Sequence, residues 1–236
     1  MKGKNGFYAK YIKRILDIFC SGLGMILFCW VYAIIALLVR IKLGSPVIYK
    51  ANRPGRIDSK TGKEQIFQLY KFRSMTNETD ENGTLLPDTQ RLTKFGRILR
   101  ATSLDEIPEL FNIFKGDMSL IGPRPLGVKY LPYYTDEERH RHDIRPGLTG
   151  LAQVRGRNNL SWEEKFAYDI EYVKNVSFLF DVRILFETVV KVFKREGIGQ
   201  GDERPISLHI ERARKFENTV GGKTIESVCS QRENKE

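Results

Sequence analysis

The sequence predicts an α+β protein, in which an N-terminal membrane-inserted helix, re-entrant or spanning, precedes a small, mainly helical catalytic domain with short β elements. Residues 18–39 carry no charge and, as a helix, cover about 33 Å, the thickness of a bilayer core. Two short β-like stretches follow, and apolar residues at helical spacing dominate the later part of the chain. We expect the anchor and its flanks over residues 1–45, the catalytic domain over 46–197 and a polar tail over 198–236.

The charge balance of the chain favours anionic partners. Its 236 residues include 39 Lys and Arg against 29 Asp and Glu, which gives a formal net charge of +10. Nucleic acid, an acidic membrane surface and phosphorylated substrates all fit this charge, which by itself does not choose among them. The three cysteines, Cys20, Cys29 and Cys229, have neither paired nor metal-like spacing, which argues against a disulfide scaffold and a zinc site and fits a reducing cytoplasmic exposure.

The apolar run indicates a retained anchor, because it is longer than the apolar part of a signal peptide and has bulky residues at its end. Basic residues lie in equal number before it, up to Arg14, and after it, from Arg40 onward. Positive charge normally marks the cytoplasmic side, so neither end is clearly exported. A bent helix that enters and leaves the cytoplasmic leaflet and an ordinary span both stay open. Gly22 and Gly24 favour a bend, although the run contains no proline.

The remaining elements are placed by periodicity and turn residues. We expect strands in residues 46–51 and 65–72, joined by a polar turn at 58–62, and a surface loop over 77–90. The expected helices cover residues 91–101, 103–115, 161–175 and 178–195. The apolar stripe of the last helix faces either the protein core or, as an interfacial amphipathic helix, the membrane. The polar tail beyond 197 is expected to be loosely held.

The segment 100–124 contains the most informative acidic residues. Ser103 and Glu106 have the spacing of a capping box, with Ser103 as N-cap. On one interpretation Asp105 and Glu106 are simply acidic residues that suit a helix N-terminus. On the other, the same N-terminus keeps Asp105 ionised, as a nucleophile or a Mg²⁺ ligand.

Two arginines frame this acidic pair. The turn at residues 121–125 contains Pro123 and Pro125, which restrict the backbone and hold Arg124 for bidentate contact with a phosphate. Arg100 lies just before the pair and is a candidate partner for it. Carboxylates flanked by arginines predict a site for phosphoryl transfer, in which positioning and charge stabilisation do most of the catalysis.

Two further segments have the composition of phosphate-binding loops. Residues 71–75 follow a predicted strand, and residues 142–157 are rich in Gly and Arg. Neither contains a P-loop or a dinucleotide-binding fingerprint. His140 and His142 are expected to be exposed or hydrogen-bonded rather than metal-bound, because no third ligand lies at a suitable spacing.

Several motifs in series resemble those of the bacterial sugar transferases, also called small monotopic phosphoglycosyl transferases or undecaprenyl-phosphate sugar phosphotransferases. The resemblance covers roughly residues 10–195. Members that transfer bacillosamine phosphate are the most similar. The matching motifs are Lys13-Arg14-x-x-Asp17, Arg53-Pro-Gly55, Lys71-Phe-Arg73, Ser103-Leu-Asp-Glu-Ile-Pro108, Leu110-Phe-Asn112, Lys115-Gly-Asp-Met-Ser119, Ile121-Gly-Pro-Arg-Pro125 and Arg145-Pro-Gly-Leu-Thr-Gly-Leu-Ala-Gln153.

The resemblance implies a two-step transfer. Asp105 attacks the β-phosphate of a UDP-sugar and UMP leaves; the phosphate of undecaprenyl phosphate then attacks the aspartyl intermediate. Mg²⁺ is implied at Asp105, with Glu106 assisting the lipid phosphate or supporting the metal. The implied substrate-binding residues are Lys71, Arg73, Arg100, Pro123, Arg124, Pro125 and Arg145. The implied membrane-associated residues are Lys13, Arg14, Asp17, Cys29 and Trp30, the last two standing where the family has a helix-bending Ser-Pro pair.

The resemblance also implies partners and a location. It points to the bacterial inner membrane with the catalytic domain on the cytoplasmic face, where UDP-sugars are found. A UDP-N-acetylhexosamine is the favoured donor, from the segments 156–158 and 161–163. The implied partners are membrane lipids and, as an open alternative, a second copy in a homodimer, but no nucleic acid. The competing functions are a membrane-bound, Mg²⁺-dependent phosphodiesterase or pyrophosphatase, and a non-catalytic basic protein that binds membrane or nucleic acid.

Overall fold

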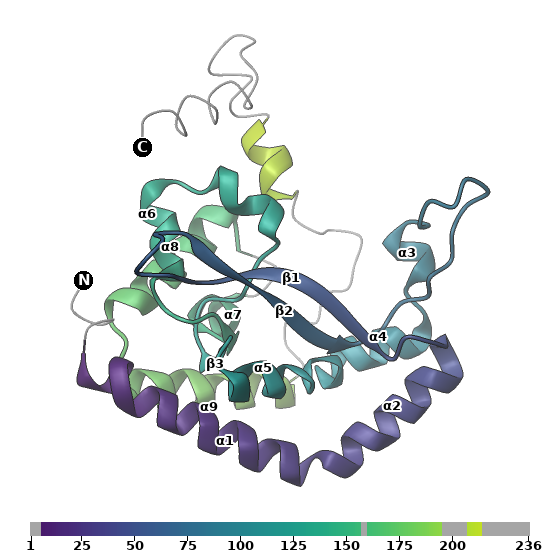
Figure 1. Ribbon diagram of the computed structural model, residues 1–236, viewed down its shortest axis with the longest axis horizontal. Helices are drawn as coiled ribbons and strands as arrows, with labels where there is room; N and C mark the ends of the chain where they lie inside the picture. Colours follow the sequence, from purple (N-terminus) through teal and green to yellow (C-terminus); the bar gives the residue numbers. More distant parts are fainter. Residues whose placement is uncertain (1–5, 157–159, 195–206, 214–236) are drawn as a thin grey trace.

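The computed structural model describes residues 6–156, 160–194 and 207–213. It is an α+β structure, as predicted, with two small sheets among many helices. Figure 1 shows α1 (Lys13–Leu27) and α2 (Cys29–Leu43) as a V along one side of the molecule, with its apex pointing away from the rest. A π-helical turn, η2 (Tyr8–Ile12), leads into α1.

The apolar run is broken at one residue. Phe28, with φ −99° and ψ 9°, separates α1 from α2, and the helices on either side are bent by 63°. Among the described residues no single helix is long and apolar enough to cross a bilayer; the bent pair Tyr8–Leu27 and Cys29–Leu43 reaches that length and composition when taken together. The bend therefore forms without the proline that the family pattern contains.

Docking of the two helices at different places on the domain explains the bend. The two glycines of α1 lie against α5 (Glu109–Lys115): a Cβ at Gly24 would lie 3.3 Å from Leu110, and one at Gly22 would lie 3.5 Å from Phe114. In α2, Ile35 and Val39 are buried in a separate cluster that includes Phe72. Gly24 thus helps α1 to approach α5 closely, whereas a Cβ at Gly22 would make an ordinary van der Waals contact, and the hinge itself lies at Phe28.

The predicted strand pair is confirmed. β1 (Ile48–Ile57) and β2 (Glu64–Phe72) form an antiparallel hairpin, with Ile48 opposite Phe72 and Pro54 opposite Ile66. The register shifts between Pro54 and Ile57. Phe67, Leu69 and Phe72 point inward, and Figure 1 shows the hairpin as a long twisted ribbon across the domain.

The predicted helices at 91–101 and 103–115 are each divided. α3 (Asp88–Arg91) and α4 (Lys94–Ala101) replace the first, with Thr93 capping α4 by accepting from Gly96 N–H. A 3₁₀ turn, η3 (Leu104–Glu106), and α5 replace the second. Pro108 explains the second division, because a proline lacks the N–H that a continuous helix needs.

The glycine- and arginine-rich segment is more regular than predicted. β3 (Ser119–Ile121) pairs in parallel with β4 (Gly147–Thr149). Between and after these strands lie η4 (Val128–Tyr133), α6 (Asp136–Arg139), η5 (His140–Asp143) and α7 (Leu151–Arg155).

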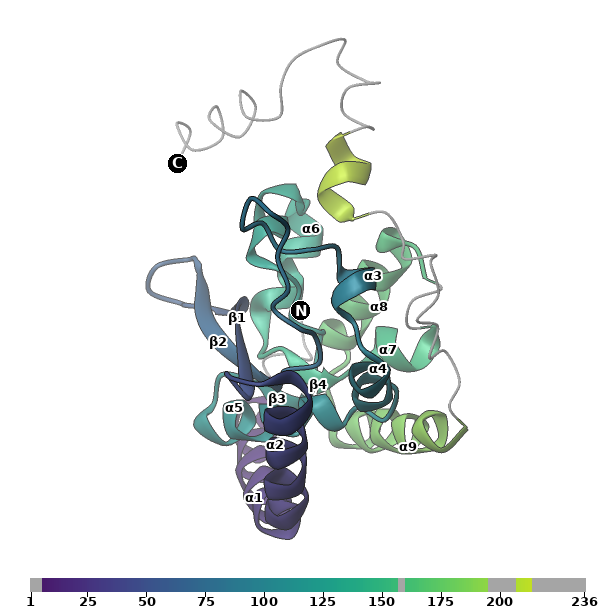
Figure 2. The same ribbon diagram turned by 90° about the vertical axis from the view of Figure 1, so that its right-hand side faces the viewer.

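The last two predicted helices are confirmed as α8 (Trp162–Lys174) and α9 (Phe178–Lys194). A capping box of Ser161 and Glu164 starts α8. Figures 1 and 2 both place α9 near α1, on the side of the molecule from which the V projects. Ile184 of α9 is fully buried, whereas Phe186 and Val189 are exposed, so the helix has both a core-facing stripe and an outward apolar stripe.

Part of the predicted polar tail is held by the domain. Leu208 is fully buried among Tyr134, Trp162 and Phe166. Arg212 donates to both carboxylate oxygens of Glu138, at 2.6 and 2.8 Å. The expectation of a loosely held tail is therefore wrong for residues 207–213, because the buried Leu208 and the ion pair of Arg212 fix them. The predicted boundary at 197/198 lies outside the described residues.

We predict that the ion pair between Lys13 of α1 and Asp181 of α9 is required for stability. The two charges lie 2.5 Å apart and are both buried. Lys13→Met should lower the free energy of unfolding by about 3–5 kcal/mol, because it leaves a buried carboxylate without its cation. Denaturant or thermal unfolding in detergent measures this, with exposed Lys10→Met as the control.

A compensating variant tests the physical reason. Lys13→Met combined with Asp181→Leu removes both buried charges and should recover much of the lost stability. Strictly additive losses in the double variant would show that the destabilisation does not come from an uncompensated charge.

Candidate active site

The predicted turn at residues 121–125 is held by neighbouring backbone. Gly122 N–H donates to Thr149 O at 2.9 Å, and Gly147 N–H donates to Pro123 O at 3.0 Å. The two backbones approach so closely that a Cβ at Gly122 would lie 2.5 Å from Arg145 O. Glycine is therefore needed here for close approach, and the turn that carries Arg124 is fixed by β4 as well as by its prolines.

A buried ion pair supports the same turn from behind. Arg141 is 2% exposed and pairs with Asp169 at 2.7 Å. The same Nη2 also donates to Arg124 O at 2.7 Å, while Nη1 donates to Tyr134 Oη at 3.2 Å. The backbone of Arg124 is thus tied to η5 and α8, which fixes the direction from which its side chain enters the site.

The side chain of Arg124 reaches Glu106. Arg124 Nη2 lies 2.6 Å from Glu106 Oε1, and Lys71 Nζ lies 2.7 Å from the same oxygen. Burial acts to raise the pKa of Glu106, but the charges of Arg124 and Lys71 outweigh it and hold that pKa at about 2. Glu106 is therefore ionised throughout the physiological range. Its presence raises the pKa of Arg124 further above its ordinary value.

Asp105 has the opposite electrostatic environment. It is 7% exposed, and burial followed by the charge of Glu106 raises its pKa to about 6. The charges of Lys71, Arg100 and Arg124 partly oppose this rise. Two adjacent carboxylates whose pKa values are pushed apart are typical of catalytic acid–base or nucleophilic pairs. Asp105 changes charge close to neutral pH, and Glu106 does not.

The predicted capping box at Ser103 is wrong. Ser103 has φ 56° and ψ 17°, in the left-handed region, and its side chain makes no capping hydrogen bond. Residues 104–106 form a single 3₁₀ turn rather than the start of a long helix. The expectation that a helix N-terminus keeps Asp105 ionised therefore fails, because burial dominates its pKa. A strained residue next to the acidic pair is itself a feature common at active sites.

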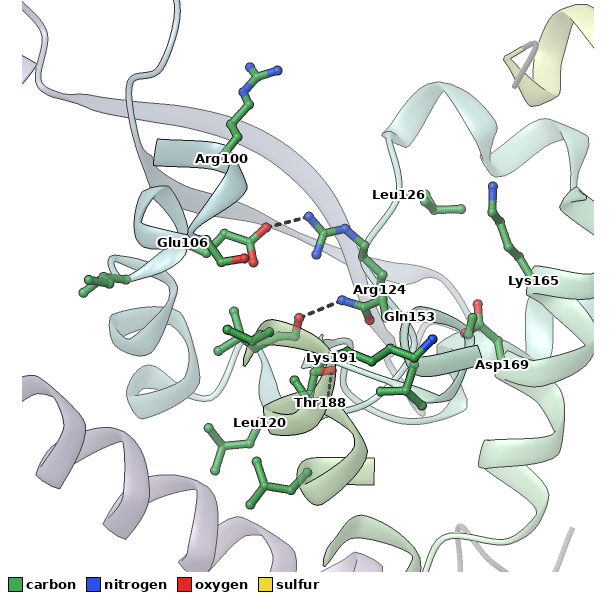
Figure 3. Close-up of a pocket in the computed structure, with 18 of the residues that line it drawn as sticks. Arg100, Glu106, Leu120, Arg124, Leu126, Gln153, Lys165, Asp169, Thr188 and Lys191 are labelled. Atoms are coloured by element: carbon green, nitrogen blue, oxygen red, sulfur yellow. Dashed lines mark hydrogen bonds and ion pairs between the residues drawn. The ribbon is translucent and has the colours of Figure 1, made fainter. Parts of the chain in front are cut away.

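A pocket of about 990 Å³ lies against this pair. Glu106, Arg100 and Arg124 line it, and Figure 3 shows Arg124 and Glu106 joined across its upper part. Glu106 and Asp169 are the acidic residues of its described lining, and Asp169 is paired with Arg141, whereas Asp105 is not part of that lining. Arg100, on α4, donates from Nε to Ser74 Oγ at 2.8 Å. The structure thus brings together the predicted group of Asp105, Glu106, Arg100, Arg124 and Lys71.

Two predicted substrate-binding arginines have structural contacts instead. Arg73 is 5% exposed and donates to the carbonyl oxygens of Leu43, the last residue of α2, and of Ser45. Arg145 donates from Nε to Gly116 O at 2.8 Å. Neither lines the pocket described above. A substrate-binding role for Arg73 and Arg145 is not supported by this geometry, because their donors satisfy the carbonyls at helix ends.

Three residues predicted to associate with the membrane instead attach α1 to the domain. Lys13 pairs with Asp181, as described above. Arg14 donates to the carbonyls of Ile113 and Phe114, at 2.6 and 2.8 Å, and so caps the end of α5. Asp17 accepts from Ser119 Oγ at 3.0 Å and from Leu120 N–H at 2.9 Å.

Cys29 and Trp30 differ from these three. Both are exposed at the start of α2, directly after the hinge at Phe28. Their position is consistent with the predicted contact with lipid, which stays a prediction.

The predicted environment of the two histidines is confirmed. His142 is buried and lies 3.3 Å from Glu64, while His140 lies 3.0 Å from Asp143. In the described part of the chain no group of three or more His, Cys, Asp or Glu side chains is arranged to hold a metal ion. A resident metal enclosed by protein ligands alone is therefore not supported there.

The site fits Mg²⁺ only when the ion is bound jointly by a protein carboxylate and by the phosphates of a substrate. It is commonly held by one or two carboxylates together with the phosphates of a substrate. Asp105 supplies one such carboxylate, while the nearest other, Glu106, is already engaged by Lys71 and Arg124. The donor set thus fits a Mg²⁺ ion that arrives with a phosphorylated substrate.

Sequence reasoning missed Glu109. It is 2% exposed, lies 3.0 Å from Lys71 Nζ, and has its pKa raised to about 7, first by burial and also by Glu106. Its spacing of four and three residues from Asp105 and Glu106 places all three carboxylates on one face of a helical segment, a signal present in the sequence. The pocket residues Thr188 and Lys191 were also missed, and no short motif marks them; Gln153 ends one of the family motifs but was not assigned to the site.

Comparisons with known proteins agree with this geometry. Residues 8–195 match the family described as bacterial sugar transferase. The uncharacterized sugar transferase EpsL of Bacillus subtilis is 50% identical over 192 residues, which are 80% of this chain and 91% of EpsL. The undecaprenyl-phosphate galactose phosphotransferase of Salmonella typhimurium is 39% identical over 207 residues, 80% of this chain and 42% of that protein.

A third relative carries a different sugar in its name. The UDP-N-acetylgalactosamine-undecaprenyl-phosphate N-acetylgalactosaminephosphotransferase of Aeromonas hydrophila is 34% identical over 187 residues, 76% of this chain and 43% of that protein. The chain thus spans less than half the length of the Salmonella and Aeromonas relatives. Relatives of similar identity are named for different sugars, so similarity at this level does not select one.

We predict that the side-chain carboxyl of Asp105 titrates with a midpoint near pH 6. Because this pKa lies above that of an exposed aspartate, its contribution to stability is present at low pH and is lost as the pH rises through about 6. Glu106→Gln should lower the midpoint, since it removes the neighbouring negative charge. The pH dependence of the ¹³Cγ shift of labelled Asp105 measures both; exposed Glu81→Gln is the control. An unchanged midpoint in Glu106→Gln would contradict the assigned cause.

Proposed function

The chain belongs to the bacterial sugar transferase family, and we propose that it transfers a sugar 1-phosphate from a UDP-sugar to undecaprenyl phosphate, with release of UMP. The observation that carries the proposal is the Asp105–Glu106 pair, whose pKa values are separated to about 6 and about 2 beside Arg124 and a large pocket. A transferred phosphoryl group needs a carboxylate that is ionised but not already neutralised by a partner, together with fixed positive charge.

In the first step Asp105 is the nucleophile. One of its carboxylate oxygens attacks the β-phosphorus of the UDP-sugar, and the bond from that phosphorus to the bridging oxygen of UMP breaks. UMP leaves with the bonding electrons, and a sugar-phosphate–aspartyl bond remains. Arg124 and Arg100 offset the negative charge of the phosphoryl group. Glu106 faces the pocket but is the weaker candidate, because Lys71 and Arg124 both hold its oxygen.

In the second step the acceptor lipid discharges the intermediate. A phosphate oxygen of undecaprenyl phosphate attacks the same phosphorus, the aspartyl bond breaks, and Asp105 is regenerated as a carboxylate. The product is the diphosphate-linked lipid sugar. Glu106 assists by orienting Arg124 and Lys71 around the reacting phosphate, a role that its ion pairs with both residues support.

Mg²⁺ is proposed to arrive with the donor and to bind at Asp105. When bound, it supplies positive charge that offsets the phosphates of the donor. The protein contributes one carboxylate and the cations Arg100 and Arg124 on the pocket wall.

An N-acetylated amino sugar is the proposed sugar of the donor. The Aeromonas relative is named for N-acetylgalactosamine, and the segments 156–158 and 161–163 resemble members that use such sugars. Ser161 and Trp162 lie at the start of α8, and Trp162 lines the pocket. Arg157 and Asn158 lie outside the described residues.

We place the bent pair α1–α2 in the cytoplasmic leaflet of the bacterial inner membrane. The exposed apolar side chains of both helices and the positive charge on both flanks support this placement. The names of the relatives include a lipid carrier, which supports action at a membrane. The catalytic domain would then face the cytoplasm, on the side that contains UDP-sugars.

We predict that purified protein releases UMP from a UDP-sugar in the presence of Mg²⁺ and undecaprenyl phosphate. Asp105→Asn should reduce this release by about 10⁴-fold or more, because it removes the nucleophile. A panel of UDP-sugars in detergent or nanodiscs, with UMP as the measured product, provides the test. Asp136→Asn, an exposed aspartate on α6, is the matched control.

The same assay separates the competing functions. A phosphodiesterase or pyrophosphatase would release UMP and free sugar phosphate without lipid, in repeated turnovers. A non-catalytic protein would release none, and Asp105→Asn would change nothing. Incubation with donor alone should instead give at most one UMP per protein, and peptide mass spectrometry should locate the sugar phosphate on Asp105. An adduct on Glu106 would reverse the assignment of the two carboxylates.

A further inference from the structure

The pocket beside the acidic pair has a strongly apolar end. Phe28 and Val31, at the hinge and in α2, line it on one side, and Leu185 and Val192 of α9 line it as well. Phe28, Leu185 and Val192 are each 43–48% exposed. This end of the pocket therefore connects with the exposed apolar faces of α2 and α9, rather than being closed inside the domain.

One face of α9 combines these apolar residues with polar ones. Leu185, Thr188, Lys191 and Val192 follow helical spacing and all line the pocket. Thr188 Oγ1 donates to Ile184 O at 2.7 Å and lies 2.8 Å from Thr149 Oγ1, and Gln153 Nε2 donates to Leu148 O at 2.9 Å. In Figure 3 Gln153, Thr188 and Lys191 lie below Arg124.

Two of the described lysines line the pocket: Lys165 lies over the ring of Trp162, with its Nζ 4.7 Å from the ring centroid, whereas Lys191 lies on α9. Arg124 is paired with Glu106, and Arg141 with Asp169. Within residues 6–156, 160–194 and 207–213, Lys191 forms no ion pair, and it is only partly exposed. A partly buried lysine in a pocket whose described lining has more basic than acidic side chains is suited to binding an anion.

We propose that Lys191 binds the phosphate of the acceptor lipid, while the apolar end between α2 and α9 holds the first isoprenoid units of its chain. This inference rests on the proposed function and deepens it, by assigning the acceptor subsite to α9. An anion joined directly to an apolar chain is the ligand that matches a cation adjoining an apolar opening. The nucleotide of the donor is polar and has no apolar chain that could bind in that opening.

The position of α9 fits this assignment. Its outward stripe, which includes Phe186 and Val189, is exposed, while its pocket stripe faces Glu106 and Arg124 across the cavity. A lipid that moves along the outward surface passes Leu185 and Val192 before its phosphate reaches Lys191. The same helix therefore forms the boundary between the lipid phase and the reacting phosphate.

The test separates the two half-reactions. Protein in nanodiscs is first treated with UDP-sugar and Mg²⁺ without lipid, and the UMP burst is measured. Undecaprenyl phosphate is then added at increasing concentration, and the discharge of the adduct is followed. Lys191→Met should raise the lipid concentration for half-maximal discharge by about 10-fold or more, since a charge-assisted hydrogen bond is lost. Lys191→Arg keeps the positive charge, so its half-maximal lipid concentration should be close to that of the wild type.

Arg183→Met is the matched control. It removes one positive charge from the same helix, but Arg183 is 59% exposed and pairs with Glu187 outside the pocket lining. Its lipid dependence should equal that of the wild type. Unchanged lipid dependence in Lys191→Met, or an equal effect in Arg183→Met, would overturn the assignment. A UMP burst that falls as much as the discharge would assign Lys191 to the donor instead. Absence of any burst in the wild type would refute the proposed function itself.

Discussion

The attachment of α1 to the domain is the interaction on which the rest of the structure depends. Asp181 accepts hydrogen bonds from Lys13 at 2.5 Å, and from Tyr8 and Tyr172 at 2.6 Å each. One turn further, Asp17 accepts from the backbone and side chain of β3. Buried charges are costly unless they are paired and fully hydrogen-bonded, so this network fixes one position of α1 against α9 and β3.

That constraint extends to the chemistry. β3 leads directly into the turn at residues 121–125, whose backbone is held by β4 and by Arg141. The turn places Arg124 against Glu106, and the charge of Arg124 keeps the pKa of Glu106 near 2. The ionised Glu106 in turn helps to raise the pKa of Asp105 to about 6. The anchor helix and the titration of the candidate nucleophile are therefore linked through the hydrogen bonds of Asp17 to β3, the ion pair of Arg124 with Glu106 and the charge of Glu106.

Two carboxylates that are adjacent in sequence thus acquire different properties. Glu106 is paired with Lys71 and Arg124 and holds them in place, whereas Asp105 makes no ion pair with any residue that the structure describes and loses hydration through burial. A carboxylate with that balance is more nucleophilic than one held by two cations. Glu109, whose pKa is raised to about 7 chiefly by burial, shares Lys71 with Glu106 and so limits how far Lys71 can stabilise the pair.

The sequence alone determined the α+β class, the hairpin, the helices α8 and α9, and the grouping of Asp105, Glu106, Arg100 and Arg124, because these follow from local periodicity and short motifs. Tertiary structure decided the rest. Burial raises the pKa of Asp105, whereas the expected capping box would have kept it low. Arg73 and Lys13 have structural roles because they contact segments that are distant in the sequence. The bend at Phe28 needed no proline, because two separate docking surfaces impose it; such surfaces exist only in the folded chain, beyond the reach of any local pattern.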